Sequence, residues 1–281
     1  MRTHDTPASS LTELELGLAV EESLYDLFRS FARLPRAERE DRWGYSVHHA
    51  FPTSPMFKGV WGLRLAPHEL DQALDAALAW LQARDAPFAF VWAGPGTEAP
   101  DLGARLSARG LELWEQDAPG QAAELDALDW DALHRVPDGF AAERVRDDDG
   151  LAEWAATFTA GFEVPAWAGE AWVDATKAFG IGDAPWALYL GRLGGAPVAT
   201  NILFCGAGVA TVLGIGTVVE ARGQGIGAAI TLAGLADART AGYRYAVLFA
   251  TESGARVYRR IGFRDTGSGI TRWLWRPGPA A

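Results

Sequence analysis

Apolar residues along this chain recur with two periods, about 3.6 residues in some segments and two residues in others, which predicts both helices and strands. Helical spacing predicts helices over residues 11–34, 67–84, 102–109, 147–162, 165–179 and 228–241, with a short one ending at residue 260. Alternation and short apolar runs predict strands over 60–65, 88–92, 140–145, 186–192, 198–205, 209–218, 243–249 and 269–275. Their order describes an α/β chain with a mixed sheet flanked by helices.

One stretch without charged residues, 193–219, is long enough to cross a bilayer. It contains six glycines and Pro197, and the glycines at 206 and 208 mark a turn. We therefore interpret it as two buried strands and expect no membrane association.

Length and composition favour two domains without disorder. The chain has 281 residues, of which 49% are hydrophobic, which suits more than one core. Pro137-Asp138-Gly139 has turn chemistry, so we expect domains over 1–135 and 136–281.

Charge and cysteine content bear on partners and compartment. The net charge of −11 argues against a nucleic acid partner and mildly favours an amine substrate. The single Cys205 lies in an apolar run, which predicts a buried, inert thiol and fits a reducing compartment. Residues 1–15 are polar and acidic, unlike a signal peptide, so we expect a cytoplasmic protein.

A glycine-rich segment, Arg222-Gly-Gln-Gly-Ile-Gly227, joins the strand at 209–218 to the helix at 228–241. Backbone N–H groups and the helix dipole make such a junction an anion site. No Lys-Ser or Lys-Thr pair follows Gly227, which excludes a P-loop, and the glycine spacing does not fit a dinucleotide fingerprint. The spacing that fits is R-x-x-G-x-G, so we expect a phosphate-bearing ligand of another kind.

A second motif, Tyr258 followed by Gly262-Phe263, ends a short helix that Thr251 or Ser253 is expected to cap. With both motifs in this order, the chain resembles the GNAT superfamily of acyl-CoA-dependent N-acyltransferases over about residues 140–281. The resemblance implies a mixed sheet with flanking helices, acetyl-CoA as co-substrate and no metal.

The resemblance also implies site residues. The cofactor would contact Ile215, Gly216, Thr217, Arg222, Gly223, Gln224, Gly225, Ile226, Gly227, Ala228 and Thr251, although the family often has Asn in place of Thr251. Backbone N–H groups of 215–217 would stabilise the oxyanion, and Tyr258 would protonate the leaving thiolate. Glu163 is our candidate for the general base, with Asp183, Glu220 and Glu252 as alternatives; Glu220 could instead pair with Arg222.

These motifs predict an N-acetyltransferase in which an amine of a small molecule, peptide or protein attacks acetyl-CoA directly. A non-catalytic acyl-CoA sensor or partner-binding module is the alternative. A transferase with a nucleic-acid-linked donor is a third hypothesis, which the acidic charge disfavours. We expect a monomer or a homodimer.

The first half contains a weak echo of the second. Residues 108–111, Ala-Arg-Gly-Leu, close a predicted helix and open a strand, as Arg260-Ile-Gly-Phe263 does. This predicts a degenerate copy of the same fold without the R-x-x-G-x-G loop, which would brace the second half and wall the substrate cleft.

Other groups of residues in the sequence do not indicate a further catalytic or metal site. No Cys, His and carboxylate cluster has metal-ligand spacing. Six of the twelve tryptophans are candidates to line an aromatic cleft, with ordinary core packing as the alternative: Trp43, Trp61, Trp154, Trp167, Trp172 and Trp186.

Overall fold

The computed structural model describes residues 6–51, 54–99 and 101–278. They form two compact units that interleave along the chain. The described parts of 1–27 and 119–267 make up the C-terminal unit, and those of 28–118 and 268–281 make up the N-terminal unit. The sequence had predicted a single division after residue 135.

The C-terminal unit contains a sheet in the order β5-β10-β9-β8-β7-β6. Its strands are β5 (Glu112–Glu124), β6 (Phe140–Arg144), β7 (Trp186–Leu193), β8 (Ala196–Gly206), β9 (Val209–Thr217) and β10 (Tyr245–Phe249). The β9–β10 pair is parallel and the others are antiparallel. The sheet is therefore mixed, as predicted.

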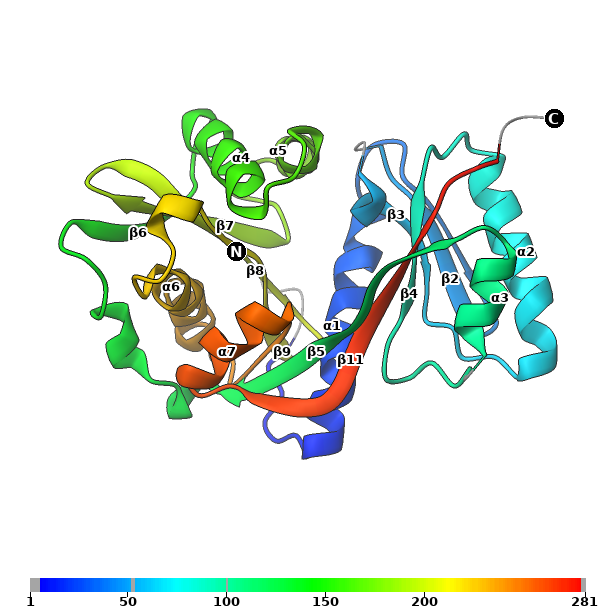
Figure 1. Cartoon of the computed structure of the whole chain (residues 1–281), viewed down its shortest axis with the longest axis horizontal. Helices are drawn as coiled ribbons and strands as arrows, with labels where there is room; N and C mark the ends of the chain where they lie inside the picture. Colours follow the sequence, from blue (N-terminus) through cyan, green and yellow to red (C-terminus); the bar gives the residue numbers. More distant parts are fainter. Residues whose placement is uncertain (1–5, 52–53, 100, 279–281) are drawn as a thin grey trace. The chain divides into compact units, whose positions relative to one another are not determined.

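Four helices flank this sheet: α4 (Asp148–Phe162), α5 (Trp167–Phe179), α6 (Ile226–Thr240) and α7 (Glu252–Arg260). Both α4 and α6 pack on β8 and β9, from opposite faces (Figure 1). The uncharged stretch 193–219 forms β8 and β9, as predicted, and Cys205 is a buried free thiol. No helix in the described part of the chain is long and apolar enough to cross a membrane.

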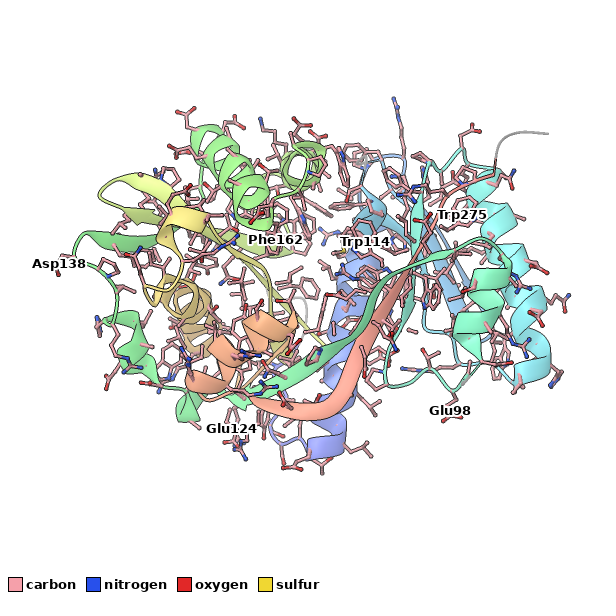
Figure 2. All side chains as sticks on the ribbon, in the orientation of Figure 1. Glu98, Trp114, Glu124, Asp138, Phe162 and Trp275 are labelled. Carbon is pink, nitrogen blue, oxygen red and sulfur yellow. The ribbon has the colours of Figure 1, made fainter. Side chains whose placement is uncertain are left out.

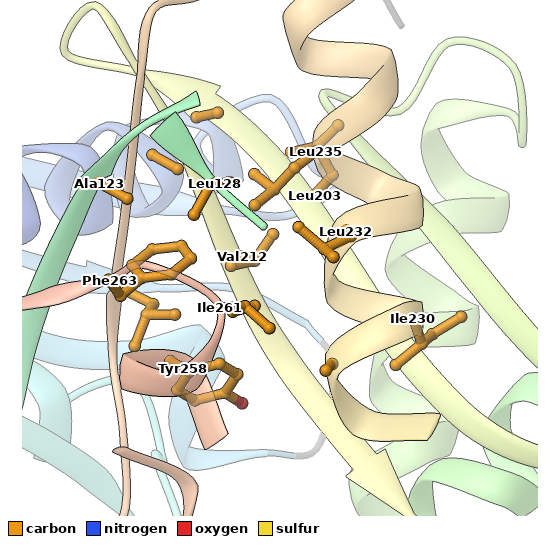
Figure 3. Close-up of a cluster of buried hydrophobic side chains, with 14 of the residues drawn as sticks. Ala123, Leu128, Leu203, Val212, Ile230, Leu232, Leu235, Tyr258, Ile261 and Phe263 are labelled. Atoms are coloured by element: carbon orange, nitrogen blue, oxygen red, sulfur yellow. The ribbon is translucent and has the colours of Figure 1, made fainter. Parts of the chain in front are cut away.

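The core beneath α6 is built from small and branched apolar residues. Leu232 and Leu235 of α6 are fully buried and lie opposite Val212 of β9 (Figure 3). The aromatic residues of the second motif, Tyr258 and Phe263, complete this cluster with ring centroids 6.1 Å apart. The second motif is therefore part of the folding core as well as a candidate for chemistry.

The N-terminal unit contains a sheet in the order β1-β2-β3-β4-β11. Its strands are β1 (Glu38–Arg42), β2 (Tyr45–His49), β3 (Lys58–Trp61), β4 (Ala89–Ala93) and β11 (Arg264–Trp275), and its helices are α2 (Pro67–Gln82) and α3 (Leu102–Ala108). Only β3–β4 among these pairs is parallel. Helix α1 (Glu13–Phe31) begins in the C-terminal unit and ends in this one.

The two units repeat one order of elements, which confirms the predicted tandem fold. β3-α2-β4-α3 in one unit corresponds to β9-α6-β10-α7 in the other, and each series includes a parallel strand pair. The four-residue echo is structural as well: Gly110 and Gly262 both have positive φ, at 78° and 109°. The N–H groups of Leu111 and Phe263 each donate to a carbonyl five residues earlier, those of Leu106 and Tyr258.

Two strands cross between the units. β5 follows α3, and its last residues pair with β10 in the C-terminal unit. β11 follows α7, and its last residues pair with β4 in the N-terminal unit. The final strand of each copy thus completes the sheet of the other copy.

Two strand boundaries differ from the prediction by several residues, and two strands were not predicted. β3 ends at Trp61 rather than at residue 65, because Gly62 has φ 71° and leaves the strand. β11 begins at Arg264 rather than at 269. β1 and β2 were not predicted: β1 has the sequence Glu-Arg-Glu-Asp-Arg, which lacks any apolar alternation.

A buried histidine makes the stability of the N-terminal unit dependent on pH. His48 of β2 is 2% exposed, stacks on Phe28 and accepts a hydrogen bond of 3.0 Å at Nδ1 from Trp61 Nε1. Burial lowers the pKa of His48 to about 3, so protonation favours the unfolded chain, in which the pKa is near 6.5.

We expect the free energy of unfolding to fall by about 2 kcal/mol from pH 7 to pH 5 through His48 alone, because stability is lost as pH drops below 6.5. Urea denaturation at both pH values measures it. His48→Gln should reduce this dependence, whereas His68→Gln, a change at an exposed position of α2, should not. Equal pH dependence in all three proteins would contradict the prediction.

Candidate functional site

β9 and β10 pair over only two residues before they separate. The parallel register joins Ala210 to Ala246 and Thr211 to Val247, and no further pair of these strands follows in the described residues. β9 continues to Thr217, so its last six residues extend beyond its parallel partner. Residues 215–217, predicted to supply oxyanion N–H groups, lie on this extension, which pairs with β8 on one side and has no β10 partner on the other.

A bulge distorts the same end of β9. Its register with β8 shifts between Thr200 and Ile202, opposite Gly214, which has φ 60°. Thr200 donates a hydrogen bond of 3.0 Å from Oγ1 to the Gly214 carbonyl and thereby fixes the bulge. The bulge re-aims the backbone that follows it, 215–217.

The predicted phosphate loop follows directly and has the conformation that its glycines permit. Gly223 and Gly225 have φ 77° and 82°, which is left-handed backbone that glycine adopts at little cost. Gly225 is the N-cap of α6 and supports no side chain, since a Cβ there would lie 2.3 Å from the Arg135 carbonyl oxygen. A Cβ at Gly223 would meet no atom within 4 Å, so solvent lies over this side of the loop.

The loop presents backbone donors without acceptors. Within the described part of the chain, the N–H groups of residues 223–228 donate to no protein atom, and the first such bond is from Ala229 to the Gly225 carbonyl. These N–H groups sit at the positive end of the α6 dipole. The arrangement can bind an anion through several backbone hydrogen bonds.

Arg222 turns away from the loop and ties it to α4 and β9. Its guanidinium donates to the carbonyls of Thr217 at 3.0 Å and Gly161 at 2.9 Å, and it pairs with the Glu163 carboxylate at 3.0 Å. Gly161 is in the last turn of α4, whose carbonyls have no helical partner. Arg222 therefore joins the end of β9 to the end of α4. The suggested pairing of Arg222 with Glu220 is wrong.

Tyr258 lies on α7 with its hydroxyl pointing away from Phe263 (Figure 3). The residue is 8% exposed, and burial raises the pKa of its phenol well above the ordinary value of 10. None of the described residues shares a hydrogen bond with this hydroxyl. It is a protonated donor without a structural partner.

Of the remaining predicted residues, one caps a helix and the others are exposed carboxylates. Thr251 caps α7, as one of the two predicted caps: its Oγ1 accepts from the Gly254 N–H at 3.2 Å. The Glu163 carboxylate is 65% exposed beside Arg222. Of the alternative bases, Glu252 pairs with Arg256 on the surface and Asp183 is exposed.

An aromatic stack, defined as Trp154, Phe158 and Phe162, runs along α4 onto β9. Ring centroids are 5.0 Å apart for the first pair and 4.7 Å for the second. A Cβ on Gly216 would lie 2.9 Å from Cε2 of Phe162. The sequence predicted Trp154, Phe158 and Phe162 on one helix, but Phe162 was not among the predicted site residues. The signals that could have pointed to it are the i, i+4 spacing of the aromatic residues and the glycines at 214 and 216 in β9.

The predicted aromatic cleft of tryptophans is mostly core. Trp61, Trp154, Trp172 and Trp186 are all at most 4% exposed. The described residues also contain no group of three or more His, Cys, Asp or Glu side chains that could hold a metal ion.

Comparisons with known proteins identify the fold. No protein-family model matches the sequence, and no curated protein matches it. The structure is similar to a GCN5-related N-acetyltransferase from Kribbella flavida, with a TM-score of 0.70 and 21% identity, covering 92% of this chain and 96% of that one.

Two further solved structures agree. One is a GCN5-related N-acetyltransferase from Sphaerobacter thermophilus, with a TM-score of 0.60 and 17% identity over 96% of this chain and 94% of that one. The other is a tandem GNAT protein from the clavulanic acid biosynthesis pathway, with a TM-score of 0.58 and 16% identity over 99% and 92%. The mixed sheets, the tandem order of elements and these neighbours establish that the chain has the tandem fold of GCN5-related N-acetyltransferases.

Proposed function

We propose that this chain is an N-acetyltransferase that moves an acetyl group from acetyl-CoA to an amine. The observation that carries the proposal is the row of unpaired N–H groups at 223–228, which follows the part of β9 that extends beyond its pairing with β10. Such a row suits the pyrophosphate of coenzyme A. The fold supports acyl transfer in general.

The residues have distinct proposed roles in that reaction. Acetyl-CoA supplies a thioester whose carbonyl carbon accepts the amine as the carbon–sulfur bond breaks. Backbone N–H groups of 215–217 would donate to the carbonyl oxygen as it gains charge, which is typically the largest single contribution to catalysis. Tyr258 would give its proton to the departing sulfur.

The loop and its neighbours would hold the cofactor. Arg222, Gly223, Gln224, Gly225, Ile226, Gly227 and Ala228 would surround the pyrophosphate, and Thr251 would border the pantetheine arm. Arg222 would act mainly through position, because its guanidinium already bonds the Thr217 and Gly161 carbonyls. These hydrogen bonds connect the loop, the end of β9 that includes residues 215–217, and the end of α4.

Glu163 is the proposed base for the acceptor amine. Its carboxylate is exposed beside Arg222, so an incoming amine can reach it. The pair with Arg222 is between two largely exposed groups and contributes little stability. An ammonium group can therefore replace Arg222 at this carboxylate at small cost. The acceptor would be an amine of a small molecule, peptide or protein.

We propose that the N-terminal unit does not bind acetyl-CoA. Leu106 occupies the position that corresponds to Tyr258, and α2 begins at Ala66-Pro67 without a glycine loop. Where β3 and β4 end their parallel pairing, Trp61 and Trp92 are buried, at 2% and 0% exposed, with the ring of Phe28 beside both. In the N-terminal unit, aromatic side chains fill the position that corresponds to the separation of β9 and β10.

The decisive test uses the intact protein with acetyl-CoA and a panel of amines. We expect acetyl-CoA to raise the melting temperature, because it binds the folded state alone. We further expect an amine on the panel to release free coenzyme A thiol, detected with a thiol reagent. Stabilisation without thiol release from any amine would favour a sensor, and no stabilisation would refute acyl-CoA binding.

A further inference from the structure

The aromatic stack on α4 ends at an exposed ring beside the proposed acyl position. Trp154 is 0% exposed, whereas Phe162 is 40% exposed. Phe162 is labelled in Figure 2 at the C-terminal end of α4. A partly exposed phenylalanine contributes less to stability through burial than a fully buried one. The ring of Phe162 packs against Phe158 in a tilted arrangement, with ring centroids 4.7 Å apart.

Phe162 lies directly against the strand that would hold the thioester carbonyl. A Cβ on Gly216 would come within 2.9 and 3.0 Å of its Cε2 and Cδ2 atoms, so the ring edge takes the place of a side chain there. The helix backbone is equally close: a Cβ on Gly161 would lie 3.2 Å from the carbonyl carbon of Gly216 and the nitrogen of Thr217. Only glycines permit this approach of α4 to β9.

Arg222 holds the end of α4 that carries Phe162 next to β9. Arg222 bonds the carbonyl of Gly161, the residue before Phe162, and the carbonyl of Thr217, the residue after Gly216. One guanidinium therefore joins the end of β9 to the end of α4 that carries Phe162. An acyl chain whose carbonyl is bound at residues 215–217 would meet the ring of Phe162 on the α4 side of the sheet.

We infer that Phe162 is the residue that limits the length of the acyl chain, so that the site takes acetyl and excludes longer acyl groups. The inference rests on the proposed function, because that function places the thioester at 215–217. One methylene more or less in a fitted apolar pocket typically changes selectivity about 10- to 200-fold. Removal of the ring should make room there without touching the phosphate loop.

The experiment measures dissociation constants of coenzyme A, acetyl-CoA, propionyl-CoA and butyryl-CoA by calorimetry, which needs no knowledge of the acceptor. Wild type should bind acetyl-CoA at least about tenfold more tightly than butyryl-CoA. Phe162→Ala should reduce that ratio about tenfold while its affinity for unacylated coenzyme A stays unchanged. Trp167→Ala, which removes a ring of similar exposure (38%) outside the stack, should keep the wild-type ratio.

The outcomes separate this inference from the proposed function. If wild type binds acetyl-CoA but Phe162→Ala keeps the wild-type ratio, or if wild type does not discriminate between chain lengths, the role of Phe162 is wrong and the proposed function stands. If wild type binds none of the four compounds, the proposed function fails and this inference fails with it.

Discussion

Replacing Gly225 by alanine should weaken acetyl-CoA binding by at least about tenfold and destabilise the fold by roughly 1–3 kcal/mol. Two costs add at this position. Its φ of 82° is unfavourable for a residue with a Cβ, and that Cβ would lie 2.3 Å from the Arg135 carbonyl oxygen. The backbone must shift, and the N–H groups of 223–228 then lose their common direction. Calorimetry with acetyl-CoA and urea denaturation measure the two effects.

Gly227→Ala is the matched control for this change. Gly227 is in the first turn of α6, where a Cβ would have only Thr217 Oγ1 nearby, at an ordinary 3.7 Å. Alanine also favours the helix by about 1 kcal/mol relative to glycine. This variant keeps the backbone of the loop, so it should keep its stability and bind acetyl-CoA more tightly than Gly225→Ala does. If the Gly225 variant binds as tightly as this control, the loop is not the phosphate site.

The loop could be predicted from sequence because its information is local. Glycine spacing, a preceding apolar strand and a following Ala-rich helix all lie within residues 209–241. The structure gives Gly223 and Gly225 the left-handed backbone that this pattern implies. The cap at Thr251 was predictable for the same reason, since its partner is Gly254.

Partners from distant segments could not be predicted. Arg222 contacts Gly161 and Glu163, about 60 residues earlier, and no local pattern distinguishes Glu163 from Glu220 as its partner. Phe162 likewise meets β9 closely only because Gly216 lacks a side chain. The sequence contains both partners of each contact but does not show that they meet in space.

The interleaving of the two units also could not be predicted from the sequence, for a different reason. The echo at 108–111 correctly predicted a second copy of the fold, yet it does not reveal which sheet the next strand joins. β5 and β11 are each long enough, at 13 and 12 residues, to leave one unit and enter the other. Strand pairing depends on which edges are open after the rest has folded, and local alternation carries no such information.

Tyr258→Phe should lower kcat by about 10²-fold or more while acetyl-CoA affinity stays unchanged, because only proton transfer to the leaving sulfur is lost. Stability is the informative control. Tyr258 is 8% exposed as a residue, and its hydroxyl shares no hydrogen bond with any described residue. Removal of this hydroxyl should therefore not destabilise the protein, since no hydrogen bond to a described residue is lost.

Tyr189→Phe provides the matched comparison, because that hydroxyl donates to Asp237 at 2.5 Å. This variant should lose about 1 kcal/mol of stability and keep its kcat. The pH profile adds a separate test. Burial raises the pKa of Tyr258, so the acid stays protonated through neutral and moderately alkaline pH, and a loss of kcat with an apparent pKa below 10 would have to come from another group. Unchanged kcat in Tyr258→Phe would show instead that the ring is retained for packing against Phe263 alone.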